Sequence, residues 1–452
     1  MLGPTSALAE LLRQGCSLAT EDWVDNHWRL ILWKLAGMVC LDPEHKFSAD
    51  GKRWSWNEVL RQLLYRYEKE LNGGSRPALR LITTQDAPAS LPMTLCISNI
   101  FWTEAGIGPD GFAILPHPEL ELTDGWYRLR AEVDEPLARA ARKGHLQIGR
   151  KLEVAGAKLS TGRSEPCEVL EAYSTVHLIL MGNATHLAPW HAKLGFMPKP
   201  PITTLNSLTP DGGLVQLADL VVAKMYPIAY IEFVEENGRQ RREGPRKEDE
   251  EFKVHERWLA QREREEDKLR QEIRGKHNIY NDWVDRLMRK SRGHFYPKEE
   301  DSPPNDLEDM FDRLVDGEDD INRLASRLSP MNAGWLADFI TNRVLKEQEQ
   351  ADEEIEQDLK KICPPRNVRS FRVLFMTDAN TSRRPGTRTA EITVWDVLTL
   401  SFDDGKPGYF KEGQRFLITN LQPTQHGAWM RHTDEDSRVY LCTRRNSRWT
   451  KL

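Results

Sequence analysis

The feature that most constrains this chain is a long polar stretch from Gly244 to Pro365. Residues 248–274 contain neither glycine nor proline, and Pro245 stands where a first helical residue is favoured. A helix from Pro245 to Arg292 would reach on the order of 70 Å at about 1.5 Å per residue, which is longer than a compact domain is wide. Its apolar residues are too sparse for the core helix of a globular domain.

A second helix is expected to run back along the first. Its apolar residues keep one narrow stripe, which suits an antiparallel two-helix stalk: Leu336, Ile340, Val344, Ile355, Leu359 and Ile362. We therefore expect a helical tower over residues 244–365, inserted into another domain and most simply a solvated spacer.

Residues 1–90 have a helical pattern and are expected to form a helical domain. Apolar residues recur every three or four positions in Glu21–Leu41, and Ser55 with Glu58 forms a capping box that opens a further helix. Five tryptophans lie between residues 23 and 56, more than a small helical core requires. Most are expected in the core, and one or two could form pockets for a partner's side chains.

Strand patterns fill the rest of the chain. Residues 91–206 read as a five-stranded barrel with a helix between its third and fourth strands, the pattern of an oligonucleotide/oligosaccharide-binding fold (OB-fold). Further strands lie in Leu214–Val234 and in Arg369–Thr443, on either side of the tower. A barrel that lacks a strand would expose its edges, so the two pieces should close one sheet over residues 207–243 and 366–452. The expected fold class is α+β, with a helical domain, two OB-fold barrels and a tower in the second.

Composition excludes several classes of protein. A hydrophobic fraction of 39% with 14 tryptophans excludes a wholly disordered chain. No apolar run has the length of a membrane span and no signal peptide opens the sequence, so we expect a soluble, intracellular protein. The six cysteines are scattered, which predicts no disulfide framework and no metal site. Common catalytic and nucleotide-binding motifs are absent, so we expect no enzyme, no catalytic residue and no cofactor.

Charge is unevenly distributed. Between Arg366 and Leu452, 15 basic and 9 acidic residues give a net charge of +6, whereas the whole chain carries −6. A basic final module on an acidic body places any polyanion binding at the C-terminal end.

Single strands bind OB-folds by stacking bases on aromatic rings while cations follow the phosphates. Alternation along the strands is expected to turn Phe371, Val373, Phe375, Ile392 and Val394 inward and to leave Arg372 and Trp395 on the outer groove. The candidate DNA-binding residues are Arg372, Trp395, Lys406, Trp429, Arg431, Arg444, Arg445 and Trp449. The alternative is that Trp395 and Trp429 seal the barrel and the arginines only solvate it.

Several separated motifs resemble one family in the same order. They are Trp23–Met38, Leu122–Tyr127, Lys193–Phe196, Asp211–Gly213 and Tyr226–Ile228. They resemble the C-terminal DNA-binding region of the breast cancer type 2 susceptibility protein family. The resemblance implies a nuclear recombination mediator that binds single-stranded DNA, pairs with a small acidic protein of the Dss/Sem type, and supports loading of a RecA-family recombinase in double-strand break repair.

The sequence departs from the family in two ways. A third OB-fold and repeats built on Phe-x-Thr-Ala are not found, so we expect a fragment or a shortened form whose recombinase contacts lie in other segments. The resemblance also directs attention to cations beside aromatics in the first half as the surface for the acidic partner: Trp28, Arg29, Trp33, Lys34, Arg128, Arg130 and Lys158.

The tower tip is a third candidate, because in the family it resembles a duplex-binding helix-turn-helix. Basic and aromatic residues gather there: Trp283, Arg286, Arg289, Lys290, Arg292 and His294. Against duplex binding, Glu299–Asp320 carries a net charge of −10, which repels phosphate. The main hypothesis is a non-enzymatic single-strand binder and scaffold. Its rivals are a docking scaffold for the acidic partner with little DNA binding of its own and an accessory to an absent nuclease or helicase chain.

Overall fold

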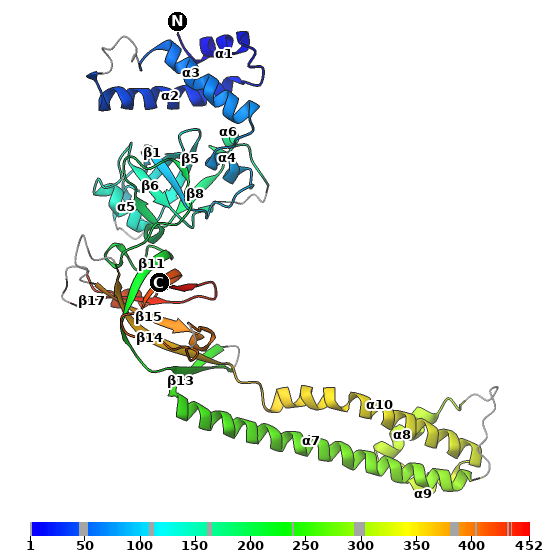
Figure 1. The fold of residues 1–452 in the computed structure, drawn as a ribbon. Coiled ribbons are helices and arrows are strands. Elements are labelled where there is room, and N and C mark those ends of the chain that lie inside the picture. Colours follow the sequence, from blue (N-terminus) through cyan, green and yellow to red (C-terminus); the bar gives the residue numbers. More distant parts are fainter. Residues whose placement is uncertain are drawn as a thin grey trace. The chain divides into compact units, whose positions relative to one another are not determined.

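The chain folds into two compact units, Met1–Ile228 with Ser370–Leu452, and Ala229–Arg369. The computed structural model describes residues 2–44, 53–107, 113–160, 165–236, 239–292, 303–379, 388–402, 405–431, 434 and 436–452. The expected α+β class is confirmed, with a helical domain, curled sheets and a long helix between strands (Figure 1).

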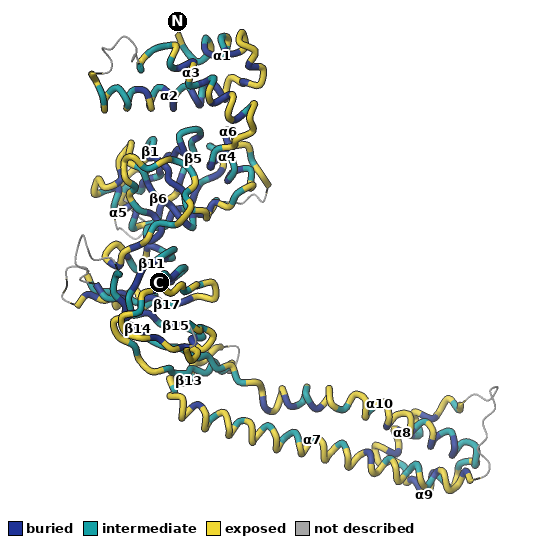
Figure 2. The backbone as a smooth tube through the Cα atoms, in the orientation of Figure 1, coloured by how far each residue is buried: buried dark blue, intermediate teal, exposed yellow. Residues whose placement is uncertain are grey.

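Two helices of the N-terminal domain start at side-chain caps, and the cap at Ser55 was predicted from the sequence. Thr20 accepts a hydrogen bond from the Trp23 amide, and Ser55 Oγ accepts one from the Glu58 amide at 3.3 Å, which fixes two helix starts. Apolar faces of these helices pack into one cluster that continues into the first barrel (Figure 2). The elements are α1 (Pro4–Arg13), α2 (Glu21–Leu41), α3 (Trp56–Arg66), η2 (Tyr67–Asn72) and α4 (Ala78–Thr83).

The first barrel has the strand order expected of an OB-fold. Its path runs β7-β8-β5-β4-β1-β6-β9, with β5 parallel to β8, and α5 follows the third barrel strand as the sequence predicts. The barrel elements are β1 (Met93–Trp102), β4 (Pro118–Thr123), β5 (Arg128–Val133), α5 (Glu135–Arg142), β6 (Lys151–Val154) and β8 (His177–Leu180). The shorter elements are β2 (Gly106–Ile107), β3 (Ala113–Ile114), β7 (Lys158–Leu159), α6 (Val169–Ala172), η3 (Gly182–Ala184), β9 (Thr185–Leu187), β10 (Gly195–Phe196) and η4 (Leu205–Ser207).

The second barrel is closed by segments from both sides of the tower. β11 pairs with β16 on one edge and with β14 on the other, so the ring β11-β16-β17-β15-β14 has no free edge. The prediction that the two pieces form one sheet is therefore confirmed. The elements are β11 (Val215–Met225), β14 (Val368–Asp378), β15 (Arg388–Trp395), η5 (Val397–Thr399), β16 (Arg415–Pro423), η6 (His426–Ala428), β17 (Ser437–Cys442) and β18 (Trp449–Lys451).

The other unit is a hairpin that leads directly into the tower. Pro245 is not the first helical residue, because it lies in a strand whose neighbour Arg246 pairs with Tyr230. The helix begins at Glu248, where the Lys247 amide donates to the Glu250 side chain at 3.1 Å. The elements are β12 (Ala229–Glu236), β13 (Arg239–Lys247), α7 (Glu248–Ser291), α8 (Leu307–Val315), α9 (Ile321–Arg327) and α10 (Pro330–Ile362).

The tower is held by the narrow apolar stripe that the sequence indicates. Of the six expected stripe residues of α10, five are buried, and only Ile362 is wrong, with half of its surface exposed. At the far end, α8 and α9 pack on α7 and α10 around a separate apolar cluster centred on Leu287, Phe311 and Leu336 (Figure 1). The tip is thus a small bundle with its own core.

Candidate nucleic-acid interface

The outer face of β14 and β15 is the oligonucleotide-binding side of an OB-fold. Leu374 and Met376 point into the barrel with no exposed surface, opposite Ile392 and Ala390. The expected inward positions of Phe371, Val373 and Phe375 are therefore wrong: these side chains are half-buried on the other face. The inward positions of Ile392 and Val394 are confirmed.

Four aromatic residues and two cations gather on this outer face. The ring centroids of Phe371 and Trp395 lie 5.4 Å apart, and those of Tyr226 and Phe375 lie 5.7 Å apart. The guanidinium of Arg438 lies 5.3 Å from the centre of the Phe375 ring. Lys224 Nζ lies 5.2 Å from the centre of the Tyr226 ring. We call these six residues the aromatic strip: Lys224, Tyr226, Phe371, Phe375, Trp395 and Arg438.

Trp395 is thus placed where the sequence predicts, and its neighbours were missed. Five of the six residues from Phe371 to Met376 are apolar, so alternation alone did not indicate which set points inward. The pairing of Leu374 with Ile392 resolves the choice, and pairing depends on register.

Arg372 is not a free cation of the groove. It lies on the inward-pointing side of β14, where Nε donates to the Tyr226 carbonyl at 2.5 Å and Nη1 to the Gly408 carbonyl at 2.8 Å. Burial lowers the pKa of its guanidinium below the usual value. Arg372 therefore joins three segments of the barrel.

Trp429 and Trp449 also have structural environments. Trp429 Nε1 donates to the Thr424 carbonyl at 2.7 Å, and the ring packs against the barrel core. The Trp449 ring lies 5.4 Å from Phe410 and 5.5 Å from Phe416. The geometry of Trp429 therefore agrees with the alternative that this tryptophan seals the barrel, and Trp449 packs in the same way.

The remaining candidate cations are exposed. Lys406, Arg431, Arg444 and Arg445 lie in loops of the second barrel. Arg431 belongs to the loop between β16 and β17, and its amide donates to the Asp434 carboxylate at 3.0 Å. An OB-fold commonly uses this loop for oligonucleotides, so Arg431 fits the predicted role best.

The corresponding face of the first barrel has a different chemistry. Arg130 pairs with Glu119 and lies 5.2 Å above the Phe101 ring. Arg128 lies 3.7 Å from Glu121 and 5.5 Å from the centre of the Tyr173 ring. The cations predicted to bind an acidic partner are thus already opposed by carboxylates, which makes this face less attractive to phosphates than the aromatic strip.

The other predicted partner residues lie in the helical domain and on β7. Trp28 packs on Trp56 at 5.8 Å, and Arg29 pairs with Asp25 at 2.8 Å. Trp33 is 39% exposed, while Lys34 Nζ donates to Gln62 at 3.2 Å. Lys158 is exposed on β7. Among the described residues, no contact joins all seven of these side chains.

Glu70, which sequence reasoning missed, joins the helical domain to the first barrel. Its buried carboxylate accepts hydrogen bonds from Trp23 Nε1 at 3.0 Å, from the Tyr127 hydroxyl at 2.6 Å and from Arg80 Nη1 at 2.9 Å. Burial lowers the pKa of His27, whose Nε2 lies 3.7 Å from Glu70. Burial raises the pKa of Tyr127, which keeps that hydroxyl a donor. A glutamate between helical residues gave no sign of this role in the sequence.

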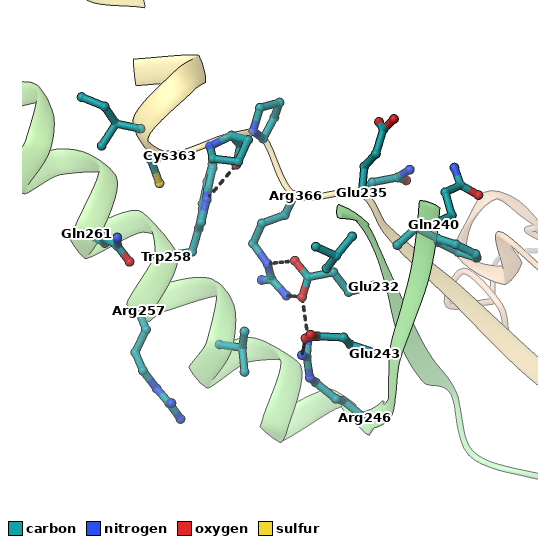
Figure 3. Close-up of a pocket in the computed structure, with 17 residues that line it drawn as sticks. Glu232, Glu235, Gln240, Glu243, Arg246, Arg257, Trp258, Gln261, Cys363 and Arg366 are labelled. Atoms are coloured by element: carbon teal, nitrogen blue, oxygen red, sulfur yellow. Dashed lines mark hydrogen bonds and ion pairs between the residues drawn. The ribbon is translucent and has the colours of Figure 1, made fainter. Parts of the chain in front are cut away.

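The root of the tower holds a cavity of about 680 Å³ with charged residues in its wall (Figure 3). Arg366 Nε and Nη2 donate to the Glu232 carboxylate at 2.7 and 2.8 Å, and Arg246 Nη1 lies 2.7 Å from the same carboxylate. Trp258 Nε1 donates to the Pro364 carbonyl at 3.2 Å. Because every charge named here already has a partner, the geometry indicates a joint between hairpin and return arm.

The described residues of the tower tip carry both exposed cations and much of the acidic run. Trp283 packs within the tip cluster, and Arg286 pairs with Asp282 at 2.8 Å. Arg289, Lys290 and Arg292 lie at the end of α7, whereas His294 and residues 299–302 of the acidic run fall outside the described residues. The described remainder of that run is exposed over much of α8 and the turn to α9.

No helix among the described residues is long and apolar enough to cross a membrane. Within the same residues, no group of three or more histidine, cysteine, aspartate or glutamate side chains could hold a metal ion.

Comparisons with known proteins match the first half of the chain. A family model described as "BRCA2, helical" matches residues 6–73, and one described as "BRCA2, oligonucleotide/oligosaccharide-binding, domain 1" matches residues 77–198. Residues 6–198 of this chain thus resemble the helical domain and first oligonucleotide-binding domain of the BRCA2 family. Two relatives from Arabidopsis thaliana, "Protein BREAST CANCER SUSCEPTIBILITY 2 homolog A" and "homolog B", are each 37% identical over 238 residues.

The match to these BRCA2 homologues covers 51% of this chain and 20% of each relative. The matched half of this chain thus spans about a fifth of the length of each relative. The two family models fit the helical domain and first barrel that the structure contains, and the resemblance drawn from sequence motifs is confirmed.

Proposed function

We propose that this chain is the single-strand-binding and scaffold region of a recombination mediator, and that the aromatic strip is its main DNA surface. The observation that carries the proposal is the pairing of four aromatic rings with Arg438 and Lys224 on the strand face of the second barrel. Bases can stack on the rings while the cations neutralise phosphates. Similarity of the first half of the chain to the BRCA2 family supports a role in homologous recombination and a nuclear location.

Equilibrium binding of a labelled oligothymidine tests the strip. Phe375→Ala and Trp395→Ala should each weaken binding by about 1 to 3 kcal/mol, because one stacked base is lost. Arg438→Gln should lower the slope of log affinity against log salt by about 0.7, the share of one phosphate on a single strand.

Trp190→Ala supplies the matched control. Trp190 is 78% exposed, lies between β9 and β10 of the first barrel, and is not part of the aromatic strip. Duplex DNA of the same sequence length should bind more weakly than the single strand. Unchanged affinity in all three strip variants would reject the strip and favour the docking-scaffold alternative.

The proposed partner is a small acidic protein of the Dss/Sem type, bound to the helical domain and first barrel. Exposed aromatic surface at Trp33 and Trp54 supports such a partner, because isolated domains with exposed apolar patches tend to aggregate. Co-expression with the acidic protein should therefore raise the soluble yield of the chain. Equal yields with and without it would argue against obligate pairing. Loading of a RecA-family recombinase is proposed for the longer protein, through segments outside this chain.

A further inference from the structure

Two oppositely charged residues of the second barrel, Asp378 and Arg388, form hydrogen bonds to the turn between the two barrels at Leu205 and Leu208. The Leu205 amide donates to both carboxylate oxygens of Asp378, at 3.1 and 3.1 Å. Arg388 Nη1 donates to the Leu205 carbonyl at 3.2 Å and to the Leu208 carbonyl at 2.9 Å. Asp378 ends β14 and Arg388 begins β15. These two paired strands therefore bind both the amide and the carbonyl of Leu205.

Arg388 also holds the loop between β16 and β17. Its Nη2 donates to the Met430 carbonyl at 2.7 Å, and its Nε donates to Ser437 Oγ at 3.1 Å. The guanidinium lies 5.6 Å from the centre of the Trp429 ring. The residue after Met430 is Arg431, the exposed cation of this loop. One buried side chain thus connects the inter-barrel turn to the segment that presents Arg431.

The chemistry of Arg388 favours a role in placement over one in stability. Arg388 is 6% exposed, and its four hydrogen bonds in the described residues go to three carbonyls and one hydroxyl, none of which carries a charge. Burying a cation against neutral acceptors is costly compared with an apolar side chain of the same size. The planar fork of arginine can, however, fix three segments at once, which lysine or methionine cannot.

We propose that Arg388 is a positioning residue for the binding of single-stranded DNA. It fixes the β16–β17 loop against the inter-barrel turn, so that Arg431 contributes to DNA binding only while Arg388 holds the loop. This inference rests on the proposed function of the second barrel. It adds that the contribution of Arg431 to DNA binding depends on Arg388, which does not itself contact the DNA.

A double-mutant cycle in the full chain tests the dependence, with a labelled oligothymidine of about 16 nucleotides, the upper site size of an OB-fold. In the wild-type chain, Arg431→Ala should lower affinity about threefold and the salt slope by about 0.7. In the Arg388→Met background affinity should already be lower, and Arg431→Ala should change neither quantity further. Equal effects of Arg431→Ala in the two backgrounds would overturn the inference.

Arg388→Lys keeps the charge, loses the fork, and carries the test if the methionine variant does not fold. We expect it to remove the effect of Arg431→Ala as Arg388→Met does, and to speed amide hydrogen exchange at residues 203–208 and 424–431 together. A lysine variant in which Arg431→Ala keeps its full effect would show that charge alone suffices, against the inference. Arg61→Met is the matched control, because Arg61 is exposed on α3 and bonds only Glu58 among the described residues.

The two proposals fail in different ways. If Arg431→Ala has no effect in the wild-type chain while Phe375→Ala still weakens binding, the role of Arg388 is rejected and the strip stands. If neither variant weakens binding, the proposed function fails first.

Discussion

Arg372 and Arg438 lie in neighbouring parts of one barrel but face opposite sides of its sheet. Arg372 donates to two backbone carbonyls from the inward-pointing side of β14. Arg438 is exposed on β17, with its guanidinium over the Phe375 ring. The sequence alone shows two arginines in basic, aromatic surroundings, and only the direction of each side chain separates a structural cross-link from a candidate phosphate contact.

Replacing each of these arginines by methionine should give opposite results. Arg372→Met leaves two carbonyls without their donors, so the barrel should lose about 1 to 3 kcal/mol of stability with an unchanged salt slope of DNA binding. Arg438→Met should lower the salt slope by about 0.7 and leave the unfolding temperature nearly unchanged. Thermal unfolding and oligothymidine titration of both variants provide the measurements. A loss of salt slope in Arg372→Met would place that residue at the phosphates after all.

The helices and strands with clear apolar periodicity or clear capping and turn residues were predictable. The N-cap at Ser55, the strand at Met93 and the stalk stripe of α10 could be predicted because each depends on local spacing. The start of α7 was missed because β13 continues past Pro245 and pairs with β12 at Arg246 and Lys247, and pairing between strands is not a local property. The candidate interface was predictable as a region but not as a residue set, since β14 is apolar on both faces.

The joint at the tower root gives the hairpin and the return arm a pH-dependent connection. Hydrogen bonds from Arg366, then from Arg246, lower the pKa of Glu232 from 4.5 to about 2. A depressed carboxylate pKa stabilises the fold fully above the unfolded value, and this stabilisation is lost as pH falls from about 4.5 towards 2. Acid should therefore loosen this joint.

Hydrogen exchange in peptides that cover β12, corrected for the intrinsic pH dependence of exchange, measures this loosening. The Phe233 amide donates to the Asn367 carbonyl at 2.9 Å, so its protection reports the joint. Wild-type protection should fall across this pH range, while Glu232→Gln should already be less protected at pH 7 and change less in acid. Glu235→Gln, exposed on the same strand, is the control and should behave as wild type. Equal pH profiles for Glu232→Gln and wild type would contradict this account of the joint.

At the scale of the whole molecule, the second barrel is complete without the unit that interrupts its sequence. β11 pairs with β14 through Met225 and Leu374, and the Tyr226 amide donates to the Val373 carbonyl at 3.0 Å. Ile228 lies just after Tyr226, and Ser370 lies just before Val373, so the two cut ends lie next to residues that are already paired. Every residue of the aromatic strip lies outside Ala229–Arg369.

Excising Ala229–Arg369 and joining Ile228 to Ser370 should consequently leave a folded barrel. A linker of about four glycine and serine residues can span neighbouring antiparallel strands, whose Cα atoms are about 5 Å apart. Oligothymidine affinity should stay within about threefold of the intact chain, because the stacking rings and their cations are retained. Duplex affinity should also be unchanged, because the charged side chains of the tip are largely acidic or paired. A selective loss of duplex binding on excision would instead place a duplex site in Ala229–Arg369 and contradict its interpretation as a spacer.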